Sequence, residues 1–310
     1  MRDGTILCCG EALIDMLPRR TDAGETAFAP YPGGAVFNTA IALGRLGAPA
    51  AFFTGLSTDL FGQMLERSLE ASQVDAGMAA RSDRPTTLAF VTLEDGQARY
   101  AFYDENTAGR MLTLRDLPAF PPEITAMFFG GISLAADPCG AVYSGLMRAE
   151  AARRVTMIDP NIRPGFIADE PAYRDRIAGM IAAADIVKLS DEDLRWLDGA
   201  GDTATLARAV LGRGPKAVLI TEGAKGATGY TAAGEVFVPA RPVEVADTVG
   251  AGDTFNAGVL AALARAGCLT KPALAELPEA RLAEALGLGI RAAAVTVSRA
   301  GANPPWAREL

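Results

Sequence analysis

The chain has 310 residues, half of them hydrophobic, which suits one large α/β domain with a smaller appendage, or two modest domains. Its net charge of −8 disfavours nucleic acid and anionic membrane as partners, and the absence of histidine excludes a Ser–His–Asp triad and histidine-bound zinc or haem. The four cysteines show no CxxC spacing, and the sequence shows neither a secretory leader nor an apolar run of membrane-spanning length. A cytoplasmic protein is therefore expected.

The first part of the chain predicts alternating strands and helices. A buried strand is expected over Thr5–Cys9, whereas residues 11–31 are polar, lack helical periodicity and predict a loop-rich segment. A helix is expected over residues 36–46, a strand over 50–56 and a second helix over 62–71.

The residue composition changes after residue 85. Residues 86–93 and 98–103 are rich in β-branched and aromatic side chains, and Asp95-Gly96 between them is a pair typical of tight hairpin turns. A hairpin that interrupts alternating strands and helices suggests a flap carried on the main sheet.

The alternation then resumes, with strands expected over residues 127–129, 155–158, 186–189 and 217–221. This pattern is typical of a mostly parallel sheet covered by helices, in which functional sites lie at the carboxyl ends of the strands. Polar residues stand at those strand ends: Asp159, Asn161, Arg163, Lys188, Ser190 and Thr221.

The most informative segment is DTVGAGDTFNAG, residues 247–258, which follows a strand-like run and leads into an Ala-rich helical stretch. A loop of small residues at a helix N-terminus leaves backbone N–H groups free to bind an anion. Asp253 adds a carboxylate there, either as a plain helix cap or as a base that takes a proton from a hydroxyl near a phosphate. Because the chain has no GxxxxGK[ST] and no GxGxxG after its first strand, Gly250–Gly252 is the candidate phosphate site.

Three further segments each allow two interpretations. Gly33-Gly34 to Asn38 is either a tight turn with an exposed amide or a backbone that lets a ligand approach closely. DPNIRP at 159–164 is either a rigid turn with a surface ion pair or a strand end whose arginine grips a phosphoryl group. TEGAKG at 221–226 has glycines three residues apart, which nucleotide loops and hairpin turns share.

Together these segments resemble the PfkB (ribokinase-like) family of sugar kinases over essentially the whole chain. The resemblance rests on GGAVFNTAIALGRLG at 33–47 and DTVGAGDTFNAG at 247–258, which have the order and separation of the family's two signatures. It implies a three-layer α/β/α fold with a mostly parallel central sheet. It also implies a single kinase domain over residues 1–310, with a small β-sheet lid formed by about 11–32 and 85–106.

The resemblance implies a role for each candidate site residue. Asp253 resembles the catalytic base, and Arg163 resembles a residue that contacts phosphate. The N–H groups of Gly250, Ala251 and Gly252 resemble the anion hole for the transferred γ-phosphate. The implied sugar-binding residues are Asp15, Gly33, Gly34, Asn38 and Phe102. The implied nucleotide-binding residues are Asn161, Lys188, Ser190, Thr221, Gly223, Gly226 and Asn256.

The implied co-substrate is ATP with Mg²⁺. The family often carries N-x-x-E after the strand of Lys188, and here SDED at 190–193 makes Asp193 the positional match for a Mg²⁺ contact through water, with Glu192 as the alternative. Asp247 is the candidate ligand for a monovalent cation. The positions after Gly301 and Ala302 lack the hydroxyl residue common in the family, which leaves potassium dependence open.

Within the family, the GEALIDMLP opening and residues 87–112 are most similar to bacterial fructokinases, which implies phosphorylation of D-fructose to fructose 6-phosphate. Kinases for 2-keto-3-deoxygluconate are one alternative. They often place an arginine after the lid aromatics, where this chain has Asp104, which is expected to repel an acid sugar. A catalytically silent sugar or nucleotide sensor is the other alternative, and the intact Asp253 and Gly250–Gly252 loop disfavour it. The expected partners are a small sugar and ATP, and the lid edge, often a dimer surface in the family, is the candidate homodimer contact.

Overall fold

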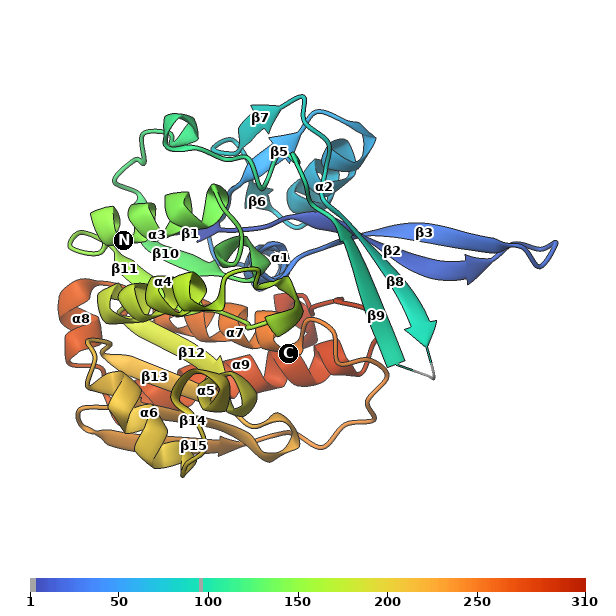
Figure 1. The fold of residues 1–310 in the computed structure, drawn as a ribbon. Coiled ribbons are helices and arrows are strands. Elements are labelled where there is room, and N and C mark those ends of the chain that lie inside the picture. Colours follow the sequence, from blue (N-terminus) through green and yellow to red (C-terminus); the bar gives the residue numbers. More distant parts are fainter. Residues whose placement is uncertain (1–3, 95–96) are drawn as a thin grey trace.

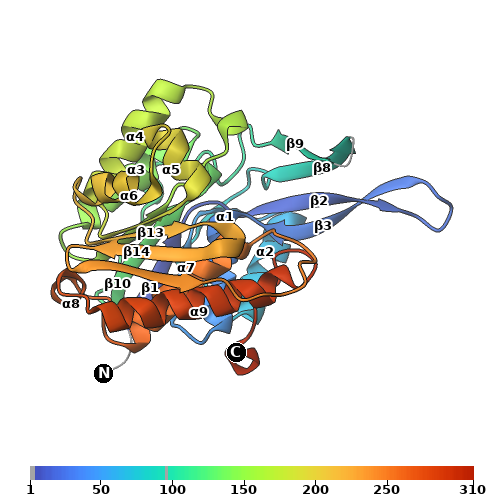
Figure 2. The same ribbon diagram turned by 90° about the horizontal axis from the view of Figure 1, so that it is seen from below.

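The computed structural model describes residues 4–94 and 97–310. A nine-stranded sheet forms the centre of the molecule, with helices on both faces, and a smaller sheet extends away from the core (Figure 1; Figure 2). The strands of the large sheet run in the order β15 (Gly234–Pro239), β14 (Gly226–Thr231), β13 (Ala217–Thr221), β12 (Ile186–Ser190), β11 (Val155–Asp159), β10 (Ile124–Gly130), β1 (Thr5–Cys9), β4 (Ala50–Phe53) and β6 (Val74–Asp75). Among the described strands of this sheet, every pairing is parallel except β13 with β14 and β14 with β15, so the predicted mostly parallel sheet is confirmed.

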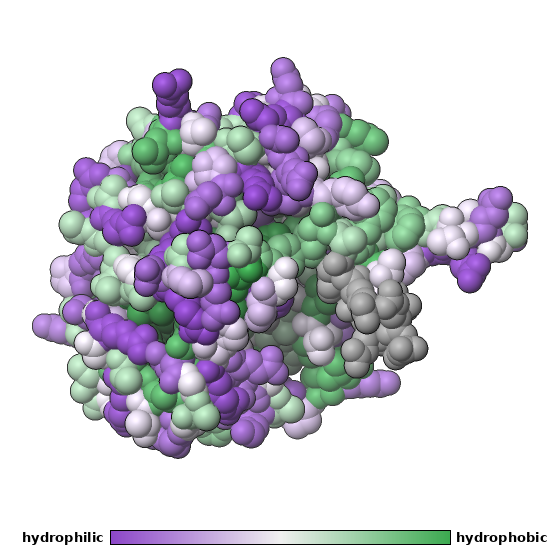
Figure 3. Space-filling model, in the orientation of Figure 1, coloured by the Kyte–Doolittle hydropathy of each residue, from purple (hydrophilic) through white to green (hydrophobic). Residues whose placement is uncertain are grey.

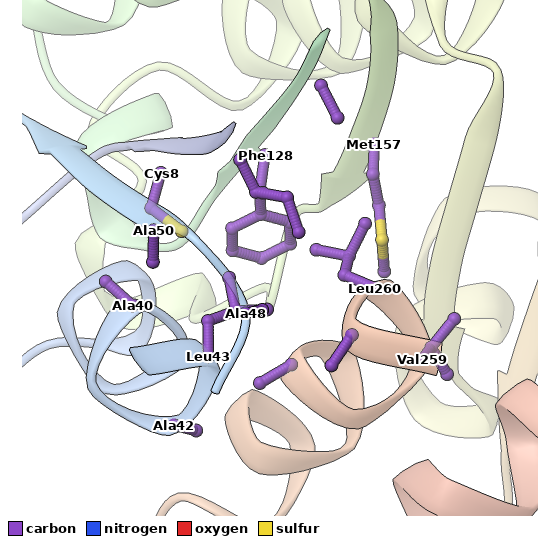
Figure 4. Close-up of a cluster of buried hydrophobic side chains, with 14 of the residues drawn as sticks. Cys8, Ala40, Ala42, Leu43, Ala48, Ala50, Phe128, Met157, Val259 and Leu260 are labelled. Atoms are coloured by element: carbon purple, nitrogen blue, oxygen red, sulfur yellow. The ribbon is translucent and has the colours of Figure 1, made fainter. Parts of the chain in front are cut away.

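Helices cover both faces of this sheet. One face carries α1 (Ala35–Arg45), α2 (Leu60–Ala71), α7 (Ala251–Arg265) and α9 (Glu279–Val297), and the other carries α3 (Cys139–Glu150), α4 (Glu170–Ala183), α5 (Asp191–Asp198) and α6 (Thr203–Leu211). The short α8 (Lys271–Ala275) lies between α7 and α9 in the sequence. Since parallel strands are buried on both faces, they read as continuous apolar runs, and a separate hydrophobic cluster fills each side. In the first cluster Phe128 and Met157 of the sheet pack against Leu43 of α1 and Leu260 of α7 (Figure 4).

The smaller sheet, here called the lid, contains four strands in the order β3 (Thr26–Gly33), β2 (Leu13–Arg20), β8 (Leu88–Glu94) and β9 (Gln97–Tyr103). The hairpin expected over residues 86–103 is present as β8 and β9, and its Asp95-Gly96 turn lies outside the described residues. Hydrophobic residues gather where the lid leaves the core (Figure 3).

Two predictions about strands are wrong. Residues 11–31 are not a loop-rich segment, because most of them form β2 and β3 of the lid. Proline in a sequence argues against a strand, and these two strands contain Pro18, Pro30 and Pro32. An edge strand such as β3 nevertheless tolerates proline. The strand expected over 50–56 is divided into β4 and β5 (Gly55–Ser57), and β5 pairs with β7 (Ala80–Ser82) in a separate two-stranded sheet.

The polar residues meet at one end of the large sheet. The carboxyl ends of β11, β12 and β13 lie beside the N-terminus of α7, which in turn packs against α1. No helix in the described part of the chain combines the length and the apolar character needed to cross a membrane.

Candidate active site

The N-terminus of α7 forms the predicted anion-binding loop. Gly250 has a left-handed backbone with φ of 78° and starts the helix. The first helical hydrogen bond runs from Thr254 N–H to Gly250 O over 2.9 Å, so the N–H of Gly252 has no partner within the helix. Ala251 N–H donates to Thr248 O over 3.3 Å. In this geometry the Gly252 N–H is therefore better placed than the Ala251 N–H to donate a hydrogen bond to a phosphate oxygen.

Asp253 lies in the first turn of the same helix and is only 8% exposed. Its Oδ2 accepts a hydrogen bond of 3.0 Å from Asn38 Nδ2, and its backbone oxygen accepts one of 3.3 Å from Thr39 Oγ1. Burial raises the pKa of Asp253 to about 7, with Asn38 opposing the rise and Asp159 adding to it. A carboxyl group with this pKa exchanges a proton readily near neutral pH, as a general base must.

The predicted sugar-binding residues of the lid lie in one row. Asp15 on β2 is paired with Ala89 on β8, and Ala89 is paired with Phe102 on β9. Paired residues on neighbouring strands point to the same face of a sheet. The carboxylate of Asp15 and the ring of Phe102 therefore flank the small, buried Ala89 on one face of the lid.

The start of α1 lies next to this row. Gly33 packs against the carboxylate of Asp15 so closely that any side chain at position 33 would collide with it. Burial raises the pKa of Asp15 to about 6. Gly34 caps α1 with φ of 108°, a backbone conformation that favours glycine, and Asn38 follows one turn later. The structure thus brings Asp15, Asn38 and Asp253 toward one region.

A buried charge cluster lies beneath the anion-binding loop. Asp159 Oδ2 accepts hydrogen bonds from Lys188 Nζ over 2.9 Å and from Asn256 Nδ2 over 2.7 Å. Burial favours the neutral amine of Lys188, yet the Asp159 carboxylate outweighs it and raises the pKa of Lys188 above its ordinary value. The ammonium lies 3.2 Å from the position that a Cβ would occupy on Gly252. A positive charge is therefore held directly behind the loop.

The loop after β11 and the start of α5 are joined by Asp193. The Ser190 hydroxyl accepts a hydrogen bond of 2.9 Å from Asp193 N–H, and Asp193 Oδ1 accepts one of 3.1 Å from Ile162 N–H. Asn161 has a left-handed backbone with φ of 45°, and Arg163 is exposed, with Nη1 donating to Ile162 O over 3.0 Å. Asp193 thereby positions the turn that carries Arg163.

A cavity of about 610 Å³ opens beside the anion-binding loop. It is lined by the predicted nucleotide residues Thr221, Gly223 and Gly226, by Ala251 and Gly252 of α7, and by apolar residues that include Val243, Phe255, Ile290 and Ala294. Its size is within the range of small-molecule sites, about 300–1,000 Å³. Asn256 does not line this cavity, because its buried amide donates to Asp159.

The sequence of this chain is similar to the sequences of known carbohydrate kinases. The sequence profile of the pfkB family carbohydrate kinases matches residues 4–308. The chain belongs to the pfkB family of carbohydrate kinases. It is 57% identical over 277 residues to a fructokinase of Rhizobium leguminosarum bv. trifolii, covering 89% of this chain and 85% of that one.

Solved structures of pfkB kinases are similar along nearly the whole chain. The Xylella fastidiosa fructokinase with bound ATP is 30% identical with a TM-score of 0.88, and the match covers 97% of this chain and 94% of that one. A double mutant of the Vibrio cholerae O395 fructokinase with fructose, ADP and a potassium ion bound is 26% identical with a TM-score of 0.84, with the same coverage. The predicted family and fold class are therefore confirmed.

Asp104 is bound by neighbouring polar side chains. Its Oδ1 accepts hydrogen bonds from Thr87 Oγ1 over 2.8 Å and from Thr107 Oγ1 over 3.1 Å, and its Oδ2 lies 3.5 Å from Arg110 Nη1. Arg110 offsets part of the charge of Asp104 and the threonines bind it, and the repulsion of an acid sugar by Asp104 stays a prediction. In this pfkB kinase Asp104 also joins β9 to the start of β8.

Two residues of the site were missed. The ring of Phe166 lies edge-on to Phe102, with centroids 3.9 Å apart, and it belongs to the 3₁₀ turn Pro164–Phe166 directly after Arg163. No sequence pattern near Phe166 predicts its contact with Phe102. Glu11 is buried at the carboxyl end of β1 and contacts the start of α1. Its place just after the first strand was the available signal.

Proposed function

We propose that this pfkB kinase transfers the γ-phosphate of ATP to the terminal hydroxyl of D-fructose and forms fructose 6-phosphate. The observation that carries the proposal is the buried Asp253, with a pKa of about 7, placed between Asn38 and the loop that borders the 610 Å³ cavity. The choice of fructose is supported by the similarity to proteins named fructokinase, at 57% identity for the Rhizobium protein.

The chain's own residues account for the transfer. Asp253 takes the proton of the sugar hydroxyl while the hydroxyl oxygen forms a bond to the γ-phosphorus. The bond from that phosphorus to the bridging oxygen breaks and releases ADP. The Gly252 N–H, the N-terminus of α7 and the Lys188 ammonium behind it stabilise the negative charge on the transferred group. Arg163, exposed on the neighbouring turn, is proposed to contact the same phosphate.

The sugar is proposed to lie between the lid and α1. Asp15 and Asn38 supply hydrogen-bonding groups for sugar hydroxyls, and Phe102 supplies an apolar face. Gly33 and Gly34 allow the backbone to come close to Asp15 and Glu11, which occupy the space that their side chains would take.

The nucleotide is proposed to occupy the cavity lined by Thr221, Gly223 and Gly226. Four residues behind the loops that border this cavity are proposed to assist nucleotide binding indirectly: Lys188, Ser190, Asn161 and Asn256. They would do so through the Asp159 and Asp193 contacts described above. The apolar lining suits a flat base, and the Gly252 end suits the phosphates.

The residues present fit a Mg²⁺ ion that accompanies ATP. Mg²⁺ usually binds substrate phosphates, water and one or two carboxylates, and the described residues contain no group of three or more acidic, histidine or cysteine side chains that would cage a metal. Both carboxylate oxygens of Asp193 accept backbone hydrogen bonds, which fits contact through water, whereas Glu192 is exposed. When bound, Mg²⁺ would neutralise charge on the phosphates.

A monovalent cation is proposed near Asp247. The Vibrio cholerae O395 structures contain a potassium ion in one case and a calcium ion in another. Here Asp247 Oδ1 accepts from Val249 N–H over 3.0 Å and Oδ2 accepts from Gly301 N–H over 2.9 Å, so this carboxylate ties the anion-binding loop to the C-terminal segment. Comparison of ADP formation in potassium and tetramethylammonium salts, for the wild type and Asp247→Asn, tests the proposal.

Two further expectations are also proposals. A homodimer is proposed to form through the lid, because the lid exposes Phe28, Tyr31 and Tyr103. Light scattering of the wild type and of a Tyr31→Ser and Tyr103→Ser variant tests it, and an unchanged mass would count against the lid contact. A cytoplasmic location, where ATP is available, is tested by fractionation of cells.

The deciding experiment is ADP formation with Mg²⁺ and ATP on D-fructose, 2-keto-3-deoxygluconate, ribose, adenosine and aminoimidazole riboside. Strong turnover of fructose that is lost in Asp253→Asn supports the proposal. Preference for the keto acid would retain the base and change the substrate. Absence of turnover on every sugar would reject the proposed function.

A further inference from the structure

Glu11 is a buried carboxylate that the proposed chemistry does not use. It follows Gly10 at the end of β1 and is 7% exposed. Its Oε1 accepts a hydrogen bond of 2.9 Å from Ala35 N–H, and its Oε2 accepts one of 3.2 Å from Ser133 N–H. It forms no ion pair with any described residue. Burial raises the pKa of Glu11, and the backbone N–H groups and the N-terminus of α1 oppose this rise.

Two glycine segments pack directly onto this carboxylate. A side chain at Gly131 would collide with the Glu11 carboxylate, and a Cβ on Gly34 would lie 3.0 Å from the Glu11 backbone oxygen. The end of β1, the start of α1 and the turn after β10 thus meet at one residue.

The contact with α1 leads to the catalytic base. Ala35 is the first residue of α1, and Asn38, three residues later, donates to Asp253 Oδ2. Thr39 on the same helix contacts the backbone of Asp253. A shift of the first turn of α1 would therefore move the donor that holds the base.

We infer that Glu11 is a positioning residue for Asp253. Its carboxylate fixes the first turn of α1 against the turn after β10, and this placement keeps Asn38 at hydrogen-bonding distance from the base. The inference rests on the proposed role of Asp253 in phosphoryl transfer. It gives Glu11 an effect on the chemical step without contact with sugar, nucleotide or the reacting atoms.

The surroundings predict an electrostatic effect as well. The negative charge of Glu11 raises the pKa of Asp253, as does that of Asp159, while Lys188 lowers it. The groups that face Glu11 are Asp104 and Arg110 from the lid junction and Cys139 and Tyr143 from α3, and Gly10 O accepts from the Tyr143 hydroxyl over 3.2 Å. Removal of the Glu11 charge by itself lowers the pKa of Asp253, whereas loss of the Asn38 hydrogen bond, the larger of the two effects, raises it.

The test compares Glu11→Gln with Asp185→Asn. Asp185 is a buried control, since it is 8% exposed and accepts a hydrogen bond of 2.8 Å from Thr156 N–H, but it also pairs with Lys271 Nζ and lies at the amino end of β12, away from the site. Both variants remove the charge of a buried carboxylate that accepts a backbone N–H, and both should lose stability toward urea. Only Glu11→Gln should lower kcat, by about 10- to 100-fold, because a small displacement of a catalytic group costs that much.

The second measurement is the pKa of Asp253 itself, followed by ¹³C NMR of its carboxyl carbon without substrate. We expect a higher pKa in Glu11→Gln, because the displaced Asn38 no longer lowers it, and an unchanged one in Asp185→Asn. If Glu11→Gln loses stability as the control does but keeps its kcat and the pKa of Asp253, Glu11 is only structural and the inference is overturned. A wild type inactive on every sugar would reject the proposed function, and the NMR comparison would still decide the role of Glu11.

Discussion

Asn38 Nδ2 lies 3.0 Å from Asp253 Oδ2, a contact between residues 215 positions apart in the sequence. It joins the helix that is proposed to bind the sugar to the helix that carries the anion-binding loop. Because the donor and the base belong to these two helices, the packing of α1 against α7 determines where the proton acceptor lies. The activity should therefore respond to changes in either helix.

Replacement of Asp253 by asparagine should remove the base while keeping its size. Since a positioned general base contributes about 10²–10⁴-fold, kcat for ADP formation with fructose should fall by that factor. Binding of ATP, measured by calorimetry, should stay within about twofold, because the cavity lining is untouched. An Asp253→Asn enzyme with near wild-type kcat would contradict the assignment.

The pH dependence should report the same carboxyl group. Only ionised Asp253 accepts a proton, so kcat/KM should rise with pH to a midpoint near its pKa of about 7. Asn38→Leu removes the hydrogen bond that lowers this pKa, and its midpoint should move to higher pH. A midpoint that moves the other way would show that Asn38 does not stabilise the carboxylate.

Stability should show the opposite trend with pH. The pKa of Asp253 is raised from 3.8 to about 7 in the folded protein, so the folded state binds the proton more tightly than the unfolded state. This contribution is fully present below the unfolded value and is lost as pH rises through about 7. Relative to Asp253→Asn, the wild type should lose urea resistance over this window, and parallel curves would contradict the raised pKa.

Replacement of one partner of the buried ion pair between Lys188 and Asp159 should destabilise the folded protein. Their side chains are 5% and 3% exposed, so Lys188→Met should lower the free energy of unfolding by about 3–5 kcal/mol by leaving a buried charge. The double variant with Asp159→Asn should recover part of this loss. The exposed pair Arg208 and Glu235 is the control, and its removal should cost about 1 kcal/mol or less. Urea titrations measure all three.

The contact between Phe166 and Phe102 should matter for sugar binding. An aromatic pair contributes about 0.5–1.5 kcal/mol, so Phe166→Ala should raise the KM for fructose about 2- to 10-fold. The KM for ATP should change little, as neither ring lines the nucleotide cavity. Phe237→Ala removes an exposed ring on β15 and serves as the control. A KM for fructose equal to that of the control would separate this pair from sugar binding.

The central sheet was predictable because its strands are buried on both faces, so residues 217–220 are apolar throughout and residues 186–189 are apolar except for Lys188. The strands β2 and β3 were not, because they contain prolines and are only partly buried over most of their length. The pairing of β2 with β8 depends on a strand more than sixty residues away, which local periodicity does not record.

The candidate site divides in the same way. The sequence by itself determined which groups are available: a glycine loop before a helix, Asp253 next to it, and the polar residues at the strand ends. Tertiary structure decided which of them meet. Asn38 reaches Asp253, Lys188 and Asn256 turn to the buried Asp159, and Arg110 offsets Asp104. The physical reason is that propensity and periodicity act over a few residues, whereas ion pairs, burial and the resulting pKa values depend on segments that only packing brings together.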